Sequence, residues 1–374
     1  MHVPFNRPYV TGVELDYVRE AIANHHLSGD GPFTKRCHEW IRQRLGCGTA
    51  LLTHSCTAAL EMAAILADVG PGDEVIMPSY TFVSTANAFV LRGAVPVFVD
   101  IRNDTLNLDE NLIEAAITSR TKAIAPVHYA GVGCDMDRIM EIANHRKLVV
   151  IEDAAQGLLS SYQGRPLGTF GQLSAISFHE TKNVIAGEGG ALVVNDEAFA
   201  HRAEVIREKG TNRTQFRRGE VDKYTWVDIG SSYLPSEIVA AFLWAQLEQA
   251  DALTDWRREI WTRYHEAFAD LEKKDRVRRP VVPSETLHNG HLYYLLMPNA
   301  AQRTQALQAL AERDINAVFH YVPLHSSPAG RKYGRAAGDL VMTDDLASRL
   351  LRLPLYPGMT TEEQHRVIEA VHSL

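Results

Sequence analysis

Apolar and polar residues follow two different spacings between residues 11 and 210 of this 374-residue chain. Apolar residues three or four positions apart predict helices at 11–24, 34–45, 56–68, 81–92, 109–118, 135–146 and 201–210. Continuous apolar runs predict strands at 49–53, 73–78, 95–100, 122–129 and 148–153, and an alternating apolar segment predicts another at 173–177. Such runs are typical of parallel strands covered on both faces. The alternation therefore predicts a doubly wound α/β domain.

The pattern changes after residue 210. Residues 211–226 are polar and basic with little periodicity, which indicates a long loop, and 236–272 has apolar residues at helical spacing. A smaller α+β part should follow, with elements at 291–297 (strand), 302–313 (helix), 316–321 (strand) and from Thr361 (helix). We predict two domains, a large α/β domain over 1–245 and a small α+β domain over 246–374.

Composition narrows the classes of function. An apolar content of 45% and a charged content of 22% are ordinary for a globular protein, and the net charge of -8 argues against nucleic-acid binding. No apolar run reaches the roughly 18 residues of a membrane span, and the first ten residues lack the layout of a signal peptide. The cysteines form no C-x-x-C pair, which predicts reduced thiols and no metal site; they are Cys37, Cys47, Cys56 and Cys134. We therefore expect a cytoplasmic protein with no nucleic-acid or membrane partner.

Polar residues at predicted strand ends are the first candidates for chemistry, because ligands of open α/β sheets bind beyond the carboxyl ends of the strands. Asp153 ends an apolar strand and Gln156 follows it. The carboxylate needs a partner there, either a cationic ligand group or the backbone of a turn that it caps. Ser55 and Thr57 begin a helix, which offers an anion site or, more simply, a helix cap.

Lys182 is unusually placed, after a buried strand and before the glycines of 187–190. Most lysines are solvated surface charges, but one held in a dry pocket is a nucleophile able to form a Schiff base. The nucleotide-binding pattern G-x-x-x-x-G-K-[ST] is absent because the lysine precedes the glycines. Tyr80 or Phe82, at the start of a helix, could stack on a flat ring or pack in the core.

Several segments, in the right order, resemble one family over essentially the whole chain. They are "PSYTFVSTANAF" (78–89), "EDAAQ" (152–156), "SFHETKN" (177–183) with "GEGG" (187–190), and "HYVPLH" (320–325). Together they resemble the DegT/StrS family of sugar-nucleotide aminotransferases, which have fold type I. The resemblance implies pyridoxal 5'-phosphate (PLP) as cofactor and a large mixed, mostly parallel sheet domain with a smaller C-terminal α+β domain.

By this resemblance Lys182 carries PLP and moves the proton in transamination, while Asp153 pairs with the pyridinium nitrogen. His179 would lie close to the cofactor, although a structural histidine is the alternative. Further cofactor contacts are implied for Phe82 on the ring face, Gln156 at the 3-oxygen, and Thr57, Ala58 and Ser177 at the phosphate. The family is homodimeric with shared sites. Its partner-chain segment "GYNYR" corresponds to 230-GSSYL-234, which places Ser232 at the phosphate-binding asparagine and Leu234 at the arginine.

The wording of "GSSYL", "SFHETKN" and "REKGTNR" (207–213) is most similar to one branch, the TDP-4-oxo-6-deoxyglucose transaminases. That resemblance implies glutamate as donor, a nucleotide-diphosphate 4-keto-6-deoxy sugar as acceptor, and a role in surface polysaccharide synthesis. The candidate substrate-binding residues are Tyr129, Arg213, Lys223, Tyr321 and His325. The basic residues near 213–223 suit a diphosphate, or form only a solvated loop. A 3-amino or GDP-linked enzyme and a non-catalytic regulatory protein are the alternatives.

Overall fold

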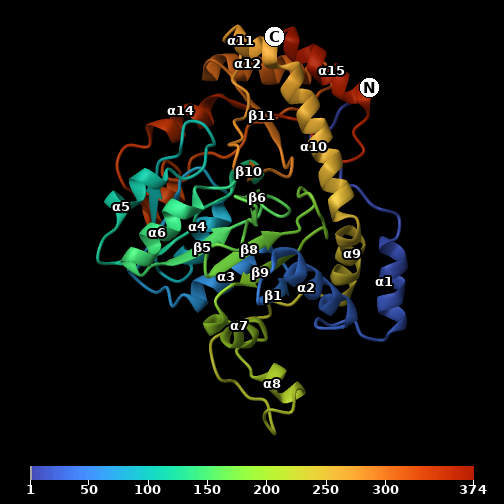
Figure 1. Cartoon of the computed structure of the whole chain (residues 1–374), viewed down its shortest axis with the longest axis vertical. Coiled ribbons are helices and arrows are strands. Elements are labelled where there is room, and N and C mark those ends of the chain that lie inside the picture. The colour runs from blue at the N-terminus through green and yellow to red at the C-terminus, as the bar shows by residue number, and fades with distance from the viewer. Residues whose placement is uncertain (1) are drawn as a thin grey trace.

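The computed structural model describes residues 2–374, and an eight-stranded sheet lies at its centre (Figure 1). The strand order is β1-β9-β8-β5-β4-β2-β3-β12. Strand β9 runs antiparallel to both neighbours, and the other adjacent pairs are parallel. The strands are β1 (Thr49–Thr53), β2 (Glu74–Pro78), β3 (Val95–Val99), β4 (Thr121–Ile124), β5 (Val149–Asp153), β8 (Leu173–Ser177), β9 (Gly190–Val194) and β12 (Arg335–Ala336). The predicted mixed, mostly parallel α/β sheet is confirmed.

Helices cover both faces of this sheet. Successive residues of β2 illustrate why, because Val75 and Met77 pack in one hydrophobic cluster and Ile76 in another on the opposite face. The first face is covered by α3 (Cys56–Leu66), α4 (Val83–Val90) and α7 (Ala200–Arg207). The second is covered by α2 (Pro32–Leu45), α5 (Ile113–Ala116), α6 (Met136–Arg146) and α9 (Glu237–Glu248), with α1 (Glu14–Ala23) packed on α9.

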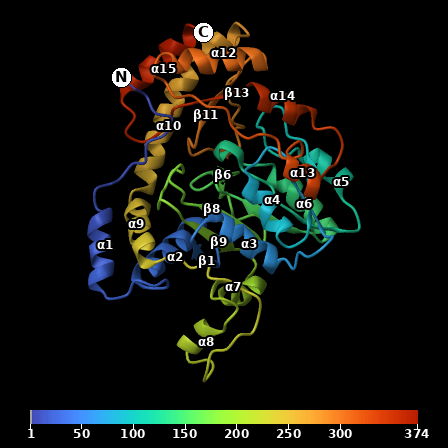
Figure 2. The same ribbon diagram turned by 180° about the vertical axis from the view of Figure 1, so that it is seen from behind.

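The C-terminal part has its own core and lies at the end of the long helix α10 (Figures 1 and 2). It pairs β11 (Tyr293–Leu296) with β13 (Leu350–Leu353) in an antiparallel ladder. Its helices are α10 (Ala250–Ala267), α11 (Ala269–Lys273), α12 (Ala300–Ala311), α13 (Pro328–Tyr333), α14 (Val341–Arg349) and α15 (Thr361–His372). A small antiparallel sheet joins β10 (Thr286–Leu287), β6 (Ser161–Tyr162) and β7 (Arg165–Pro166). None of the helices in residues 2–374 is both long and apolar enough to cross a membrane.

Strand β12 attaches the C-terminal part to the large sheet. Arg335 makes two hydrogen bonds of 3.0 and 2.8 Å to the buried carboxylate of Glu74 on β2. This hydrogen bonding lowers the pKa of Glu74 to about 2, with Thr118 and Arg120 adding further hydrogen bonds. The domain limits at 245 and 246 stay a prediction, since residues beyond them contribute both to the separate core and to the large sheet.

Several predicted elements differ from the structure. The helical region 236–272 is three helices, α9, α10 and α11, with breaks at Gln249 and Phe268. The predicted strand at 316–321 is a loop that exchanges two backbone hydrogen bonds between Val318 and Arg352. The loop 211–226 contains the short helix α8 (Arg213–Arg217). The predicted strand at 122–129 ends at Ile124, and beyond Pro126 an isolated parallel bridge joins Val127 to Asp153 of β5.

Candidate active site

A cavity of about 470 Å³ lies where the carboxyl ends of β1, β5 and β8 face β11 and β13. Eight of the sequence-predicted residues line it together, from five separate chain segments. They are Thr57, Phe82, Asp153, Gln156, Ser177, His179, Lys182 and Tyr321. The sheet therefore collects at one edge the residues that the strand-end argument selected.

Lys182 lies in the loop that connects the antiparallel strands β8 and β9. Four backbone hydrogen bonds tie this loop, from Phe178, Glu180, Lys182 and Ala186, each to a carbonyl within residues 178–189. Burial lowers the pKa of Lys182, and the guanidinium of Arg352 lowers it further against the opposing effects of Cys56 and Asp153. A lowered pKa makes the neutral, nucleophilic form of the amine more accessible.

Asp153 presents its carboxylate to the same cavity at the end of β5. Its Oδ2 accepts a 2.6 Å hydrogen bond from the hydroxyl of Thr85, and its Oδ1 accepts one of 3.1 Å from the Ala155 backbone N–H. The Thr85 hydroxyl in turn lies 2.8 Å from that of Thr81. Only 4% of Asp153 is exposed, so this chain of hydroxyls holds a buried charge in a fixed orientation.

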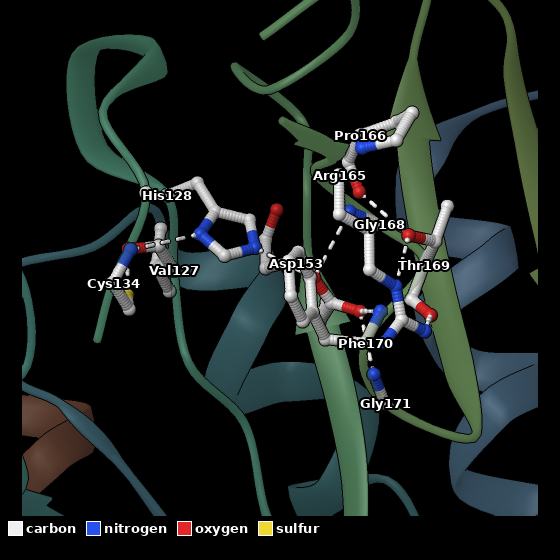
Figure 3. Close-up of polar contacts among 12 residues, drawn as sticks. Val127, His128, Cys134, Asp153, Arg165, Pro166, Gly168, Thr169, Phe170 and Gly171 are labelled. Atoms are coloured by element: carbon white, nitrogen blue, oxygen red, sulfur yellow. Dashed lines mark hydrogen bonds and ion pairs between the residues drawn. The ribbon is translucent and has the colours of Figure 1, made fainter. Parts of the chain in front are cut away.

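The neighbouring residue, Glu152, is fully buried at the same strand end. The residues that donate to it, His128, Gly168, Phe170 and Gly171, lie around Asp153 in Figure 3. One oxygen accepts from Nε2 of His128 at 2.8 Å and from the Gly168 N–H at 2.9 Å. The other accepts 2.7 Å hydrogen bonds from the backbone N–H groups of Phe170 and Gly171. Because the Cys134 N–H donates to Nδ1 of His128, the proton of this imidazole sits on Nε2. A fully bonded Glu152 thus fixes the backbone that aims Asp153 into the cavity.

The N-terminus of α3 forms the wall of the cavity best suited to a phosphate. Its first-turn backbone donors and the hydroxyls of Thr57 and Ser84, which lie 2.7 Å apart, surround one end. Ser55 caps the helix by accepting from the Ala58 N–H at 3.1 Å. Gly190 passes so close that a Cβ there would lie 2.4 Å from the Cys56 nitrogen. The backbone thus closely surrounds the N-terminus of α3, and Lys182 and Asp153 lie in the same cavity. This combination of groups fits PLP.

Aromatic and amide side chains form the walls around the position of the ring. Phe82, at the start of α4, is 56% exposed, and its ring centroid lies 6.3 Å from that of Tyr321. Gln156 accepts from the Ala130 N–H at 2.7 Å and donates to the Tyr321 hydroxyl at 2.8 Å, so its amide orientation is fixed. His179 lies toward the solvent side, with Nδ1 2.9 Å from the Thr181 hydroxyl.

Six predicted residues do not line the cavity. Ala58 lies beneath it, and Tyr129 lies behind it with its hydroxyl 2.8 Å from Nδ1 of His320. His325 instead bonds to the Ser79 hydroxyl at 2.7 Å. Ser232, Arg213 and Lys223 are also absent from the cavity lining of their own chain. Arg213 begins the projecting helix α8 (Figures 1 and 2), Lys223 follows that helix, and Ser232 pairs with Glu208. Their predicted roles stay predictions that need another chain.

The predicted basic loop is also largely paired. Arg213 lies 3.2 Å from Glu208, Arg217 lies 3.7 Å from Asp30, and Arg218 forms a close ion pair with Glu204. In residues 2–374 no cluster of three or more His, Cys, Asp or Glu side chains could hold a metal ion.

Among the cavity residues that the sequence reasoning did not identify are His291, His320 and Arg352. Burial holds the pKa values of His291 and His320 well below the ordinary range, so both rings are neutral. The Nδ1 of His291 lies 2.9 Å from Oδ1 of Asn183, next to Lys182 in the chain. Two sequence signals could have pointed to these residues. His320 is the first residue of "HYVPLH", and Arg352 is the single charged residue within the apolar run 350–355.

Comparison with known proteins agrees with this geometry. The sequence profile described as the DegT/DnrJ/EryC1/StrS aminotransferase family matches residues 8–372. The chain is 35% identical to the spore coat polysaccharide biosynthesis protein SpsC of Bacillus subtilis, over 100% of this chain and 97% of that protein. It is 32% identical to GDP-perosamine synthase of Escherichia coli O157:H7, over 99% and 98%.

Solved structures supply the cofactor. Spr1654 of Streptococcus pneumoniae has been solved in a PLP form and a pyridoxamine phosphate form, each with a TM-score of 0.92 and 27% identity to this chain. Both alignments cover 100% of this chain, and they cover 97% and 98% of the other chain. With a family profile along almost its whole length, this chain belongs to the DegT/DnrJ/EryC1/StrS aminotransferase family and is a PLP-dependent sugar aminotransferase.

Proposed function

We propose that the protein transfers an amino group from glutamate to the 4-keto carbon of TDP-4-oxo-6-deoxy-D-glucose. The products are 2-oxoglutarate and TDP-4-amino-4,6-dideoxy-D-galactose, a precursor for surface polysaccharide. The observation that carries the aminotransferase chemistry is the convergence of Lys182 and Asp153 on one cavity with the α3 N-terminus. A non-catalytic regulatory role is disfavoured, since that pair of residues is complete.

Each of the predicted cavity residues has a separate role in the proposed reaction. When bound, PLP supplies the electron sink and carries the amino group between the two half-reactions. Lys182 would hold the cofactor covalently and would move the proton in transamination, for which its lowered pKa suits it. Asp153, Phe82 and Gln156 line the cavity. Asp153 would pair with the ring nitrogen and keep it protonated, Phe82 would stack on the ring, and Gln156 would contact its oxygen substituent. Thr57, Ser84 and Ser177 would hold the phosphate together with the α3 backbone.

The acceptor is a nucleotide-linked keto sugar destined for a polysaccharide. SpsC is named for spore coat polysaccharide biosynthesis, which supports that destination. The TDP-linked 4-keto sugar is proposed from the wording of residues 177–183, 207–213 and 230–234. A GDP-linked acceptor is the second candidate, because GDP-perosamine synthase is 32% identical over nearly the whole chain.

A substrate panel distinguishes these acceptors. The holoenzyme is incubated with glutamate and, separately, with TDP-4-oxo-6-deoxyglucose, its 3-keto isomer and the GDP-linked 4-keto sugar. We expect the TDP-linked 4-keto sugar to have a kcat/KM at least about tenfold above the others, and NMR to show an axial amine at C4. A preference for the GDP-linked or the 3-keto compound would contradict the proposed substrate while leaving the aminotransferase assignment intact.

We further propose a homodimer in which each site receives residues from the partner chain. The segment around α8 projects away from the body of the molecule (Figure 1), so Arg213 and Lys223 cannot serve their own cavity in this arrangement. The same segment exposes large apolar side chains, including Trp226, which is 78% exposed, and Tyr224. Such a patch is typical of a surface covered by another protein chain.

Mixing two inactive variants tests the shared site. One is Lys182→Ala, and the other is the double variant Arg213→Ala with Lys223→Ala. When the two variants are refolded together, part of the wild-type rate should return. A dimer with one chain of each variant has one site that contains neither substitution. Variants refolded separately serve as controls. If the mixture sediments as a dimer but regains no activity, the shared site is contradicted. If the protein sediments as a monomer, the proposed homodimer is contradicted.

A further inference from the structure

His291 lies two residues before β11 and lines the cavity from the C-terminal part of the chain. Its backbone N–H donates to Oδ1 of Asn289 at 3.0 Å, and its carbonyl accepts from the guanidinium of Arg257. These two contacts fix the backbone and leave the imidazole to form its own hydrogen bonds. One ring nitrogen, Nδ1, lies 2.9 Å from Oδ1 of Asn183. The position of the ring proton therefore depends on the orientation of the Asn183 amide.

The hydrogen bonds of Asn183 fix the tautomer of His291. The Nδ2 of Asn183 donates to the backbone carbonyl of Asn289 at 2.8 Å, so Oδ1 is the amide atom that faces the ring. A carbonyl oxygen only accepts hydrogen bonds, and therefore Nδ1 of His291 carries the proton. The other ring nitrogen, Nε2, then has a lone pair and no proton. Within residues 2–374 the ring makes no second hydrogen bond, so this lone pair belongs to the wall of the cavity.

The ring of His291 stays neutral because its surroundings oppose a positive charge. Only 5% of the residue is exposed. Burial holds the pKa of His291 well below its ordinary value, and the charges of Lys182, Arg257, Arg352 and His320 add to this effect. Nε2 is therefore an unprotonated hydrogen-bond acceptor at physiological pH.

Lys182 is the hydrogen-bond donor that best matches this lone pair. Of the neighbouring charges, that of Lys182 lowers the pKa of His291 the most. Asn183, which bonds to Nδ1 of His291, is the next residue in the chain after Lys182. The imidazole is thus tied to the same loop that carries the lysine.

The other groups that favour a charged Lys182 have little acceptor capacity left for it. Cys56 and Asp153 both raise the pKa of Lys182, against burial and the charge of Arg352. Burial keeps the pKa of the Cys56 thiol well above its ordinary value, so the thiol stays protonated. The carboxylate of Asp153 already accepts from Thr85 and from a backbone N–H, and in the proposed function it also pairs with the cofactor nitrogen. The lone pair of Nε2 has no such commitment.

We propose that Nε2 of His291 accepts a hydrogen bond from the amino group of Lys182 whenever that group is not attached to the cofactor. His291 is then a positioning residue, because it fixes the direction of the amine that moves the proton. The inference rests on the role of Lys182 in the proposed function. It also has a consequence for acidity, since a hydrogen bond that the ammonium donates raises the pKa of Lys182 above the value it would have without His291.

The tautomer is tested first in the unaltered sequence. The protein is labelled with 15N at histidine and loaded with pyridoxamine phosphate, which has no aldehyde to attach to a lysine. The ring signals of His291 are identified in 15N NMR spectra by their loss in His291→Asn. We expect a protonated Nδ1 and an unprotonated Nε2. A proton on Nε2 would overturn the inference, whether or not any variant folds.

Two substitutions separate the acceptor from the structural hydrogen bond. In His291→Asn the amide reaches the position of Nδ1 and keeps the bond to Asn183, but nothing replaces Nε2. In His291→Gln the longer side chain brings a carbonyl oxygen close to the position of Nε2. Competitive acetylation with peptide mass spectrometry measures the acid dissociation constant of Lys182 in the pyridoxamine phosphate form, with the exposed Lys274 as reference. We expect this constant to rise about tenfold in His291→Asn and less than about threefold in His291→Gln.

His365→Asn is the matched control, because His365 is an exposed residue that pairs with Glu369 on α15. It should leave the dissociation constant of Lys182 unchanged. If the change in His291→Gln equals or exceeds that in His291→Asn, or if neither variant changes the constant, the inference is overturned. These measurements need neither glutamate nor a keto sugar. Rejection of every keto sugar in the panel would therefore count against the proposed acceptor alone.

Discussion

Lys182→Ala is expected to reduce the transamination rate by at least about ten-thousand-fold, the largest loss of any single substitution in the site. The change removes both the covalent attachment point of the cofactor and the group that moves the proton. Lys182→Arg should be equally inactive, because a guanidinium keeps the positive charge but cannot become a neutral nucleophile. Amino-sugar formation is measured by chromatography of the nucleotide sugars.

A second measurement locates the attachment itself. Borohydride reduction of the wild-type holoenzyme followed by peptide mass mapping should find the pyridoxyl group on the peptide that contains Lys182. Lys274→Ala is the matched control, since Lys274 is an exposed lysine 3.5 Å from Asp270 and far along the chain. Full activity in Lys182→Ala, or a label on another lysine, would refute the proposed role.

Asp153→Asn is expected to lower turnover roughly 100- to 1000-fold, by removing the charge that keeps the ring nitrogen protonated. The substitution preserves shape. The new amide oxygen can still accept from the Ala155 N–H, and the amide nitrogen can donate to Thr85, whose hydroxyl then donates to Thr81. The fold should therefore be retained, with a melting temperature within a few degrees of wild type.

Steady-state kinetics with both substrates and a thermal melt together test this expectation. Asp137→Asn is a suitable control, because Asp137 is an exposed residue in the first turn of α6 that accepts from Gln163. Wild-type turnover in Asp153→Asn would contradict the pairing with the ring nitrogen. A large drop in melting temperature would show that the carboxylate serves folding instead.

The residues that sequence reasoning could place are those whose positions follow from local patterns. Asp153 and Ser177 each end a buried strand, and parallel strands bring their carboxyl ends to one edge. Ser55 and Thr57 begin the helix that follows β1, so their place at the same edge also follows from the alternation of elements. The motif around Lys182 then completes the set.

Arg352 and His320 could not be placed in this way. Their contact with the cavity depends on the C-terminal part folding back onto the sheet edge, a tertiary arrangement that no periodicity encodes. The loop 316–321 shows the same difficulty, because its apolar residues resemble a strand although Phe319 is 53% exposed. The helix breaks at Gln249 and Phe268 carry no glycine or proline to announce them.

The reversed direction of β9 has a consequence for how this chain can change in length. Since β8 and β9 are antiparallel neighbours with Ser177 opposite Gly190, the loop between them returns to the edge it left. An insertion in that loop would displace Lys182 relative to Asp153, or break the hydrogen bonds that close the return. A longer crossover elsewhere in the sheet could absorb extra residues in a helix or at the surface. Insertions and deletions should therefore be rare in 178–189, even among relatives that have diverged at most other positions.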